Sequence, residues 1–378
     1  MEWLPVEDAL AELNVRRQTL YAYVSRGLVR AKADEGDPRR SLYLSGDIRK
    51  LRGRRRGARR RSEVAAGAIA WGEPVLESAI STVRDGDLIY RGKSAAALAR
   101  KATLEEIASL LWRSRQTAPE TARARPSGAT PKARAFAFLS QRAGADAPTL
   151  GRSPSALQRD AWSILSGFAD ALVGAPSDRP LHLRLAIAWG AKAKGREIDL
   201  VRRALVLMSD HELNPSTFAV RIAASTGAPL AACALAGLST LAGPLHGEAA
   251  SRALAQLDQL LAAPDMAAEV KAMVARGDQI AGWSHPLYPD GDVRAIDLLS
   301  ALKPRPAIAR VLRAIEKETD EKPNCDAALA AMTRDLDLPT DATFSIFALA
   351  RMTGWLAHAM EQRETGRIIR PRARYTGD

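Results

Sequence analysis

Three of the five histidines in this chain lie in short segments rich in glycine, proline or asparagine. The segments are SDHELNPSTFAVR (Ser209–Arg221) with His211, GPLHGEA (Gly243–Ala249) with His246, and GWSHPLYPDGDVRA (Gly282–Ala295) with His285. A single histidine is more often structural than catalytic, but three in polar, loop-like settings favour chemistry. The spacing predicts that Asn214 caps a helix starting at Pro215, so His211 would lie just before a helix N-terminus, where anions bind.

Charged residues that could act with these histidines follow along the chain. They are Arg294, Asp326 in KPNCDAALAAM (Lys322–Met332), Arg351 in SIFALARMTGWLAHAMEQ (Ser345–Gln362) and Arg370 in RIIRPRARYTG (Arg367–Gly377). Taken alone, Asp326 would be a carboxylate at a helix N-terminus, worth up to about 1 kcal/mol. With the histidines and arginines, it provides a base beside hydrogen-bond donors and anion-binding groups.

These segments, in this order, are similar to the citrate synthase family. The similarity runs from about Gly72 to the C-terminus and includes IYRG (Ile89–Gly92). It implies a mainly α, two-lobed fold, with a large lobe from residues 63–246 and 332–378 and a small lobe from residues 247–331. It also implies condensation of acetyl-CoA with oxaloacetate to give citrate and CoA. Propionyl-CoA, giving 2-methylcitrate, is the alternative, because one methylene changes discrimination by only about 1–3 kcal/mol.

The resemblance also implies a role for each site residue. Asp326 would remove a proton from the acyl methyl group, His246 would bind the thioester oxygen, and His285 would polarise the ketone of oxaloacetate. The residues implied to hold oxaloacetate are His211, Arg294, Arg351 and Arg370, the last reaching across a homodimer. No metal and no cofactor are expected, because the histidines polarise the carbonyls and the CoA thioester is a substrate.

Four positions depart from the family pattern. Trp283-Ser284 stands where a second glycine usually precedes the histidine, and Pro286–Pro289 lacks the base that the family loop often places near CoA phosphates. Val293 interrupts the usual DPR element, and Glu248 replaces a second glycine after GPLHG. We expect these changes to affect CoA affinity and acyl preference, since the polar site residues are retained.

The N-terminal region has the pattern of a separate basic module. Residues 1–62 have a net charge of +8, out of +12 for the whole chain. Helices are expected at Glu7–Asn14 and Arg17–Arg26, with strands at Leu28–Lys32 and Ser41–Leu44. This order resembles winged helix-turn-helix modules of the MerR and excisionase type, and it defines a domain over residues 1–52. Residues 53–62 form a basic linker, and the candidate nucleic-acid contacts are Arg16, Arg17, Arg26, Arg39 and Arg40.

This basic module keeps a second interpretation open. The chain could be a DNA-binding regulator whose citrate-synthase-like part senses oxaloacetate, citrate or CoA. Asp326 discriminates between the enzyme hypothesis and the regulator hypothesis, because a sensor needs arginines to bind anions but has no use for a base.

Other patterns set the expected surroundings of the site. A hairpin is expected over Val83–Tyr90, turning at Asp85-Gly86, and a helix over Thr103–Trp112 with Thr103 as its cap. Arg113–Lys132 should be a mobile surface loop. Gly227–Gly243 is uncharged but rich in small residues, which favours a buried helix over a membrane span.

Cellular location and the two other histidines can also be predicted. Only two cysteines occur, and the N-terminus lacks a signal-peptide pattern, so a cytoplasmic location is expected. His182 and His358 are expected to be structural.

Overall fold

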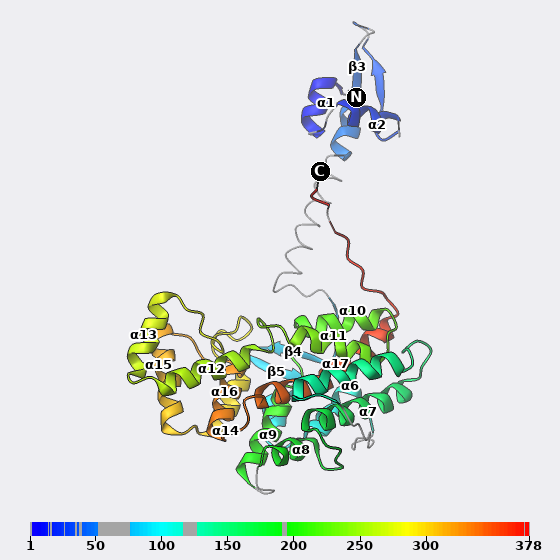
Figure 1. Ribbon diagram of the computed structural model, residues 1–378. Helices are drawn as coiled ribbons and strands as arrows, with labels where there is room; N and C mark the ends of the chain where they lie inside the picture. Colours follow the sequence, from blue (N-terminus) through cyan, green and yellow to red (C-terminus); the bar gives the residue numbers. More distant parts are fainter. Residues whose placement is uncertain are drawn as a thin grey trace. The chain divides into compact units, whose positions relative to one another are not determined.

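The computed structural model describes residues 2–13, 15, 17–25, 27–34, 36–37, 40–51, 76–115, 127–190, 195–373 and 375–377. These residues form two compact units, Met1–Glu77 and Ser78–Asp378. The predicted linker 53–62 and most of the predicted loop 113–132 lie outside the described residues. Figure 1 shows the second unit to be built almost entirely of helices.

The N-terminal unit has two helices beside a small antiparallel sheet. Helices α1 (Val6–Leu13) and α2 (Arg17–Ser25) match the predicted pair. The strands β1 (Trp3–Pro5), β2 (Ala31–Ala33) and β3 (Ser41–Leu44) pair in the order β1-β3-β2. A further helix covers residues 45–51.

Two details of this unit differ from the prediction. β1 was not expected, because three residues that include a proline show no alternating pattern. β2 begins at Ala31 rather than Leu28, since Leu28 belongs to the turn that Gly27 makes with a φ of +68° at the end of α2. The side chains that close the unit's core are Ala9, Leu13, Leu20, Val29, Tyr43 and Ile48.

The second unit begins with the predicted hairpin. Strands β4 (Ser81–Arg84) and β5 (Asp87–Tyr90) pair antiparallel, and β6 (Lys93–Ser94) adds a short third strand. Asp85 and Gly86 have φ values of 52° and 76°. Positive φ at both central residues is the requirement of a type I′ turn, so the predicted turn is confirmed.

Helices account for most of the remaining chain. The first group comprises α4 (Ala95–Ala99), α5 (Leu104–Trp112), α6 (Pro131–Ala145), α7 (Pro154–Val173), α8 (Leu181–Ala188), α9 (Arg196–Leu207), α10 (Pro215–Ser225) and α11 (Leu230–Leu241). Thr103 caps α5 and forms a capping box with Glu106, as its position predicted. Pro131 and Lys132 belong to α6 rather than to the predicted loop, because Thr130 caps that helix and proline is suited to its first position.

The second group of helices packs together on one side of the unit. It comprises α12 (Ala249–Ala262), α13 (Met266–Arg276), α14 (Val293–Leu302), α15 (Pro306–Thr319) and α16 (Cys325–Asp335). Figure 1 shows this group beside the larger set that surrounds α17 (Ala342–Thr365). The division into lobes at 246 and 331 stays a prediction.

Helix α17 is the centre of the larger set. Twenty of its 24 residues are buried, so it is covered on all sides. Helix α11, from the uncharged segment 227–243, packs closely on α10 and α17. Gly237 allows this approach because it has no side chain: a Cβ there would lie 2.7 Å from Val220 and 2.9 Å from Trp355. No helix among the described residues combines the length and apolar character of a membrane span.

Candidate active site

His211, His285 and Tyr288 meet where the turn after α9 faces the loop before α14. The His211 Nε2 atom lies 3.0 Å from the Tyr288 hydroxyl, and the rings of His211 and His285 are 5.0 Å apart, edge to face. Asn214 caps α10 by accepting from the Thr217 backbone N–H, as predicted, and this fixes the turn that carries His211.

Arg294 is fully buried beside this group. Its guanidinium donates to both carboxylate oxygens of Asp292, at 2.9 and 2.7 Å. Asp292 also accepts from the backbone N–H of Cys325, which ties the start of α14 to the start of α16. The ion pair raises the pKa of Arg294 despite burial, which acts to lower it.

Arg351 brings a second buried guanidinium from α17. It is 1% exposed, it donates from Nε to the Met208 carbonyl at 3.1 Å, and it lies 4.9 Å over the Phe347 ring. In the described part of the chain, no carboxylate lies within 4.0 Å of this guanidinium. Such a buried cation is suited to binding an incoming carboxylate.

His246 lies in the turn between α11 and α12. Its Nε2 atom is 2.9 Å from the Ser216 hydroxyl in the first turn of α10. The same hydroxyl accepts from the Trp355 indole N–H at 3.2 Å, which connects the turn to α17. Ser216 thus fixes one ring nitrogen of His246.

Asp326 occupies the first turn of α16, next to the cap Asn324. Burial raises its pKa to about 6, and the nearby Asp292 acts in the same direction, while Arg294 and Arg351 act to lower it. A pKa in this range is suited to a base that works near neutral pH.

The three histidines have the opposite perturbation. Burial lowers the pKa of His246 and of His285 to about 4, with Arg351 and Arg294 respectively adding to the effect. Burial, Arg294 and Arg351 hold the pKa of His211 well below its usual value. All three imidazoles are therefore neutral at pH 7, so each can donate one hydrogen bond but carries no charge.

The electrostatic interactions unite six of the seven predicted site residues in one cluster. The field of Arg351 acts on His211, His246, Asp326 and Arg294. His285 joins the cluster through its contact with His211. Arg370, in contrast, is exposed in the segment after α17, and within the described residues no contact joins it to the cluster.

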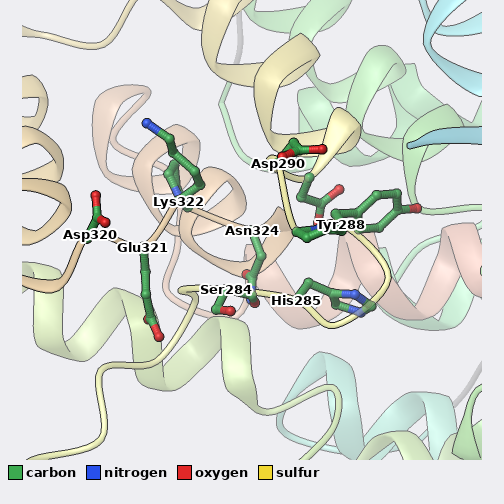
Figure 2. A pocket seen from close by; sticks show the side chains of 12 residues that line it. Ser284, His285, Tyr288, Asp290, Asp320, Glu321, Lys322 and Asn324 are labelled. Atoms are coloured by element: carbon green, nitrogen blue, oxygen red, sulfur yellow. The ribbon is translucent and has the colours of Figure 1, made fainter. Parts of the chain in front are cut away.

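A cavity of about 280 Å³ opens beside His285 and Tyr288 (Figure 2). Its other walls come from the loop before α14 and the segment before α16. The acidic side chains Asp290, Asp320 and Glu321 line it, and its one lysine, Lys322, forms an ion pair with Glu316. Tyr288 and Pro289, from the run Pro286–Pro289 that was expected to lack the family's usual base, line the same cavity.

The departure at Glu248 has a local structural role. The Glu248 carboxylate forms an ion pair with Lys132 at the start of α6, and Lys132 also lies 5.8 Å over the ring of Phe344. This side chain therefore links the turn of His246 to a helix far away in sequence.

Several residues of the cluster were missed by sequence reasoning. Tyr288 was noted only as part of a run without a base, and Ser216 only as part of a helix start. His358, predicted to be structural, is fully buried and lies 3.2 Å from Asp210, the neighbour of His211. A histidine within an apolar helix of the sequence signals burial but not its partner. No group of three or more His, Cys, Asp or Glu that could hold a metal occurs among the described residues.

Arg17 and Arg40 are the predicted nucleic-acid contacts that lie among the described residues. Arg16, Arg26 and Arg39 lie outside the described residues. Arg17 forms an ion pair with Glu7, and Arg40 forms one with Asp37. Both pairs are exposed, so solvent screens them and both arginines can still reach another anion.

Comparison with known proteins identifies relatives of this chain. Residues 161–372 match the family model for the C-terminal domain of citrate synthase. The chain is 30% identical over 360 residues to the 2-methylcitrate synthase of Shewanella oneidensis, covering 82% of this chain and 95% of that protein. It is 33% identical over 191 residues to citrate synthase 2 of Bacillus subtilis, covering 48% of this chain and 51% of that protein. With that relative and with the putative citrate synthase 2 of Mycobacterium tuberculosis, the alignment spans only about half of the relative's length.

Solved structures give the same result. Citrate synthase from Thermotoga maritima superposes with a TM-score of 0.67 at 25% identity, covering 81% of this chain and 94% of that one. Citrate synthase from Thermoplasma acidophilum, solved with carboxymethyl coenzyme A and oxaloacetate, superposes with a TM-score of 0.66 at 26% identity, again covering 81% and 94%. By its fold, its sequence and the family model, the chain belongs to the citrate synthase family.

Proposed function

We propose that the chain condenses an acyl-CoA with oxaloacetate, with acetyl-CoA as the preferred donor and citrate as the product. Propionyl-CoA, giving 2-methylcitrate, is the alternative. The observation that carries the proposal is Asp326, a carboxylate with a pKa raised to about 6 beside two buried guanidiniums and three neutral imidazoles. An anion sensor would gain nothing from such a carboxylate, which repels its ligand.

In the first step, ionised Asp326 accepts a proton from the methyl carbon of the acyl group. The C–H electrons move into the thioester, and negative charge develops on its oxygen. His246 donates a hydrogen bond to that oxygen, which lowers the energy of the enol-like species. The Ser216 hydroxyl holds the His246 ring through Nε2 at 2.9 Å and itself donates to Asn214 Oδ1 at 2.7 Å.

In the second step, the nucleophilic carbon attacks the ketone carbon of oxaloacetate. A C–C bond forms and the C=O π electrons move to oxygen. The N–H of His285 donates a hydrogen bond to that oxygen, which takes up a proton to become the hydroxyl of the product. Water then cleaves the thioester to release the product and CoA. Neutral imidazoles suit both positions, because each keeps one N–H at pH 7 that can donate to an oxygen on which negative charge develops.

The arginines would hold the two carboxylates of oxaloacetate. Arg351 is the stronger candidate, because it has no carboxylate partner among the described residues. Arg294 would share its guanidinium with Asp292, and His211 would add a hydrogen bond. We propose that Arg370 of the partner subunit of a homodimer completes the set.

The test is release of CoA thiol by the purified full-length chain. Oxaloacetate is supplied with acetyl-CoA or with propionyl-CoA, beside Asp326→Ala and the isosteric Asp326→Asn. Release that requires oxaloacetate and is lost in both variants is expected, and the better donor identifies the synthase. A folded protein that binds oxaloacetate but releases no thiol would refute the synthase and favour the sensor.

We further propose that residues 1–52 form a winged helix-turn-helix module that binds DNA. Two helices packed on a three-stranded antiparallel sheet, together with the net charge of +8 over residues 1–62, support this reading. Binding of the full chain to fluorescent duplex DNA is expected to weaken steeply as salt rises. No binding at low salt would refute it.

The two free cysteines, Cys233 and Cys325, support a reducing cytoplasmic location.

A further inference from the structure

Tyr288 is in contact with each of three residues that are proposed to interact with oxaloacetate, through its carboxylates or its ketone. Its hydroxyl lies 3.0 Å from His211 Nε2, its ring centre is 5.2 Å from that of His285, and the Arg294 guanidinium carbon lies 5.3 Å over the ring. The side chain is 3% exposed. Figure 2 shows Tyr288 and His285 next to each other at one end of the cavity.

Two protons are available to the contact between Tyr288 and His211, one on the hydroxyl and one on the imidazole ring. Burial raises the pKa of Tyr288, so its hydroxyl keeps its proton at pH 7. His211 is neutral, so its ring has one N–H and one bare nitrogen. In the described part of the chain, the Tyr288 hydroxyl has no hydrogen-bond partner other than His211 Nε2.

Two arrangements would satisfy the 3.0 Å contact. If His211 donated from Nε2, the Tyr288 proton would be left without an acceptor in a buried position, which costs free energy. If Tyr288 donates, its buried proton has an acceptor, and the ring proton of His211 lies on Nδ1. Nδ1 is also the one ring nitrogen of His211 that Tyr288 leaves available to a ligand.

We infer that Tyr288 is a positioning residue that holds His211 in its Nδ1–H tautomer, and thereby makes His211 a hydrogen-bond donor to a carboxylate of oxaloacetate. The inference deepens the proposed function and rests on it for the identity of the ligand. It distinguishes His211 from His246, because the partner of His246 is the Ser216 hydroxyl, which can both donate and accept.

The direct test is the tautomer of His211 at pH 7. The full-length chain is labelled with ¹⁵N-histidine, and the five imidazoles are resolved by their nitrogen shifts, with His211→Gln identifying the relevant pair. A protonated Nδ1 and a bare Nε2 are expected in the wild type. In Tyr288→Phe, the proton should move largely to Nε2. Protonation at Nε2 in the wild type, or an unchanged tautomer in the variant, would overturn the inference.

The second readout is oxaloacetate affinity, measured by calorimetry without any acyl-CoA. Tyr288→Phe keeps the ring and removes only the hydroxyl. Loss of one hydrogen bond to a charged ligand predicts binding about 10-fold to 100-fold weaker. The matched control is Tyr43→Phe, a buried tyrosine of the N-terminal unit, which should bind as the wild type does. Circular dichroism confirms that each variant is folded.

Kinetics separate this inference from the proposed function. Tyr288→Phe should raise KM for oxaloacetate with little change in kcat or in KM for the acyl-CoA. Normal condensation with unchanged oxaloacetate affinity in Tyr288→Phe would refute the inference alone. Weaker oxaloacetate binding in the variant, with no condensation by the wild type, would refute the synthase but support the inference. A wild type that binds no oxaloacetate would overturn both.

Discussion

Replacing Asp326 with asparagine is expected to abolish catalysis and, at the same time, to stabilise the fold at neutral pH. The carboxylate is held where burial and the nearby Asp292 disfavour its charge, and its pKa is about 6 in the folded chain against 3.8 for an ordinary aspartate. Between these two values the folded protein binds the extra proton. Stability therefore falls as the pH rises from about 4 to about 6, and the full penalty applies above pH 6.

The size of the effect follows from the same difference. Each pH unit of displacement corresponds to about 1.4 kcal/mol, so a change from 3.8 to about 6 gives an upper value of about 3 kcal/mol. Solvent access to the partly buried side chain reduces this to about 2 kcal/mol. Asparagine has nearly the same shape and no charge, so it should remove most of the penalty.

The measurement is thermal unfolding of wild type and Asp326→Asn by circular dichroism at pH 4 and pH 8. At pH 8 the variant should unfold roughly 3–6 °C higher, and at pH 4 the two should coincide within about 1 °C. An equal gain at both pH values would show that packing, not charge, is responsible. A less stable variant at pH 8 would contradict the placement of Asp326 as a destabilised base.

Three further predictions concern the site residues and the helix that carries Arg351. The kcat/KM of thiol release should rise about tenfold between pH 5 and pH 7, because ionised Asp326 is the active form; a flat profile over that range would mean that another group is the base. Gly354→Ala should destabilise the protein by about 1–3 kcal/mol in urea unfolding, since a Cβ there would lie 2.2 Å from Asp210 Oδ1, whereas an unhindered helix position would gain from alanine. Mixing inactive Asp326→Ala and Arg370→Ala chains should restore part of the activity through hybrid dimers; no recovery after subunit exchange would show that each site is built from one chain.

Local signals in the sequence predicted the turn at Asp85-Gly86 and the caps Thr103 and Asn214. Each of these depends on one or two residues whose backbone preference or side-chain oxygen acts on its immediate neighbours. The boundaries of the loop 113–132 were less well predicted. Thr130 and Pro131 carry a helix-start signal, but the surrounding arginine- and proline-rich run concealed it.

The candidate site was predictable as a set of residues but not as an arrangement. The segments of His211, His246, His285, Asp326 and Arg351 were found by their spacing and resemblance. Their pKa values depend on burial by helices that are distant in sequence, and no local pattern reports that burial.

Partners of the site residues were also beyond the sequence. Tyr288, Ser216 and the Lys132–Glu248 pair act through contacts between distant segments. Such contacts become visible only when the fold is known.

Helix α17 has a consequence for how the protein is made. It follows in the sequence every helix that it packs against, from α5 to α16, and it is buried on all sides by them. Until α17 has been synthesised, the apolar side chains that pack against it in the folded protein lack this partner. Closure of the core therefore waits for residues 342–365 to be translated, which leaves the nascent chain open to aggregation and to chaperone binding until then. Arg351 lies on the same helix. The proposed binding site for a carboxylate is therefore completed only when α17 packs into the core.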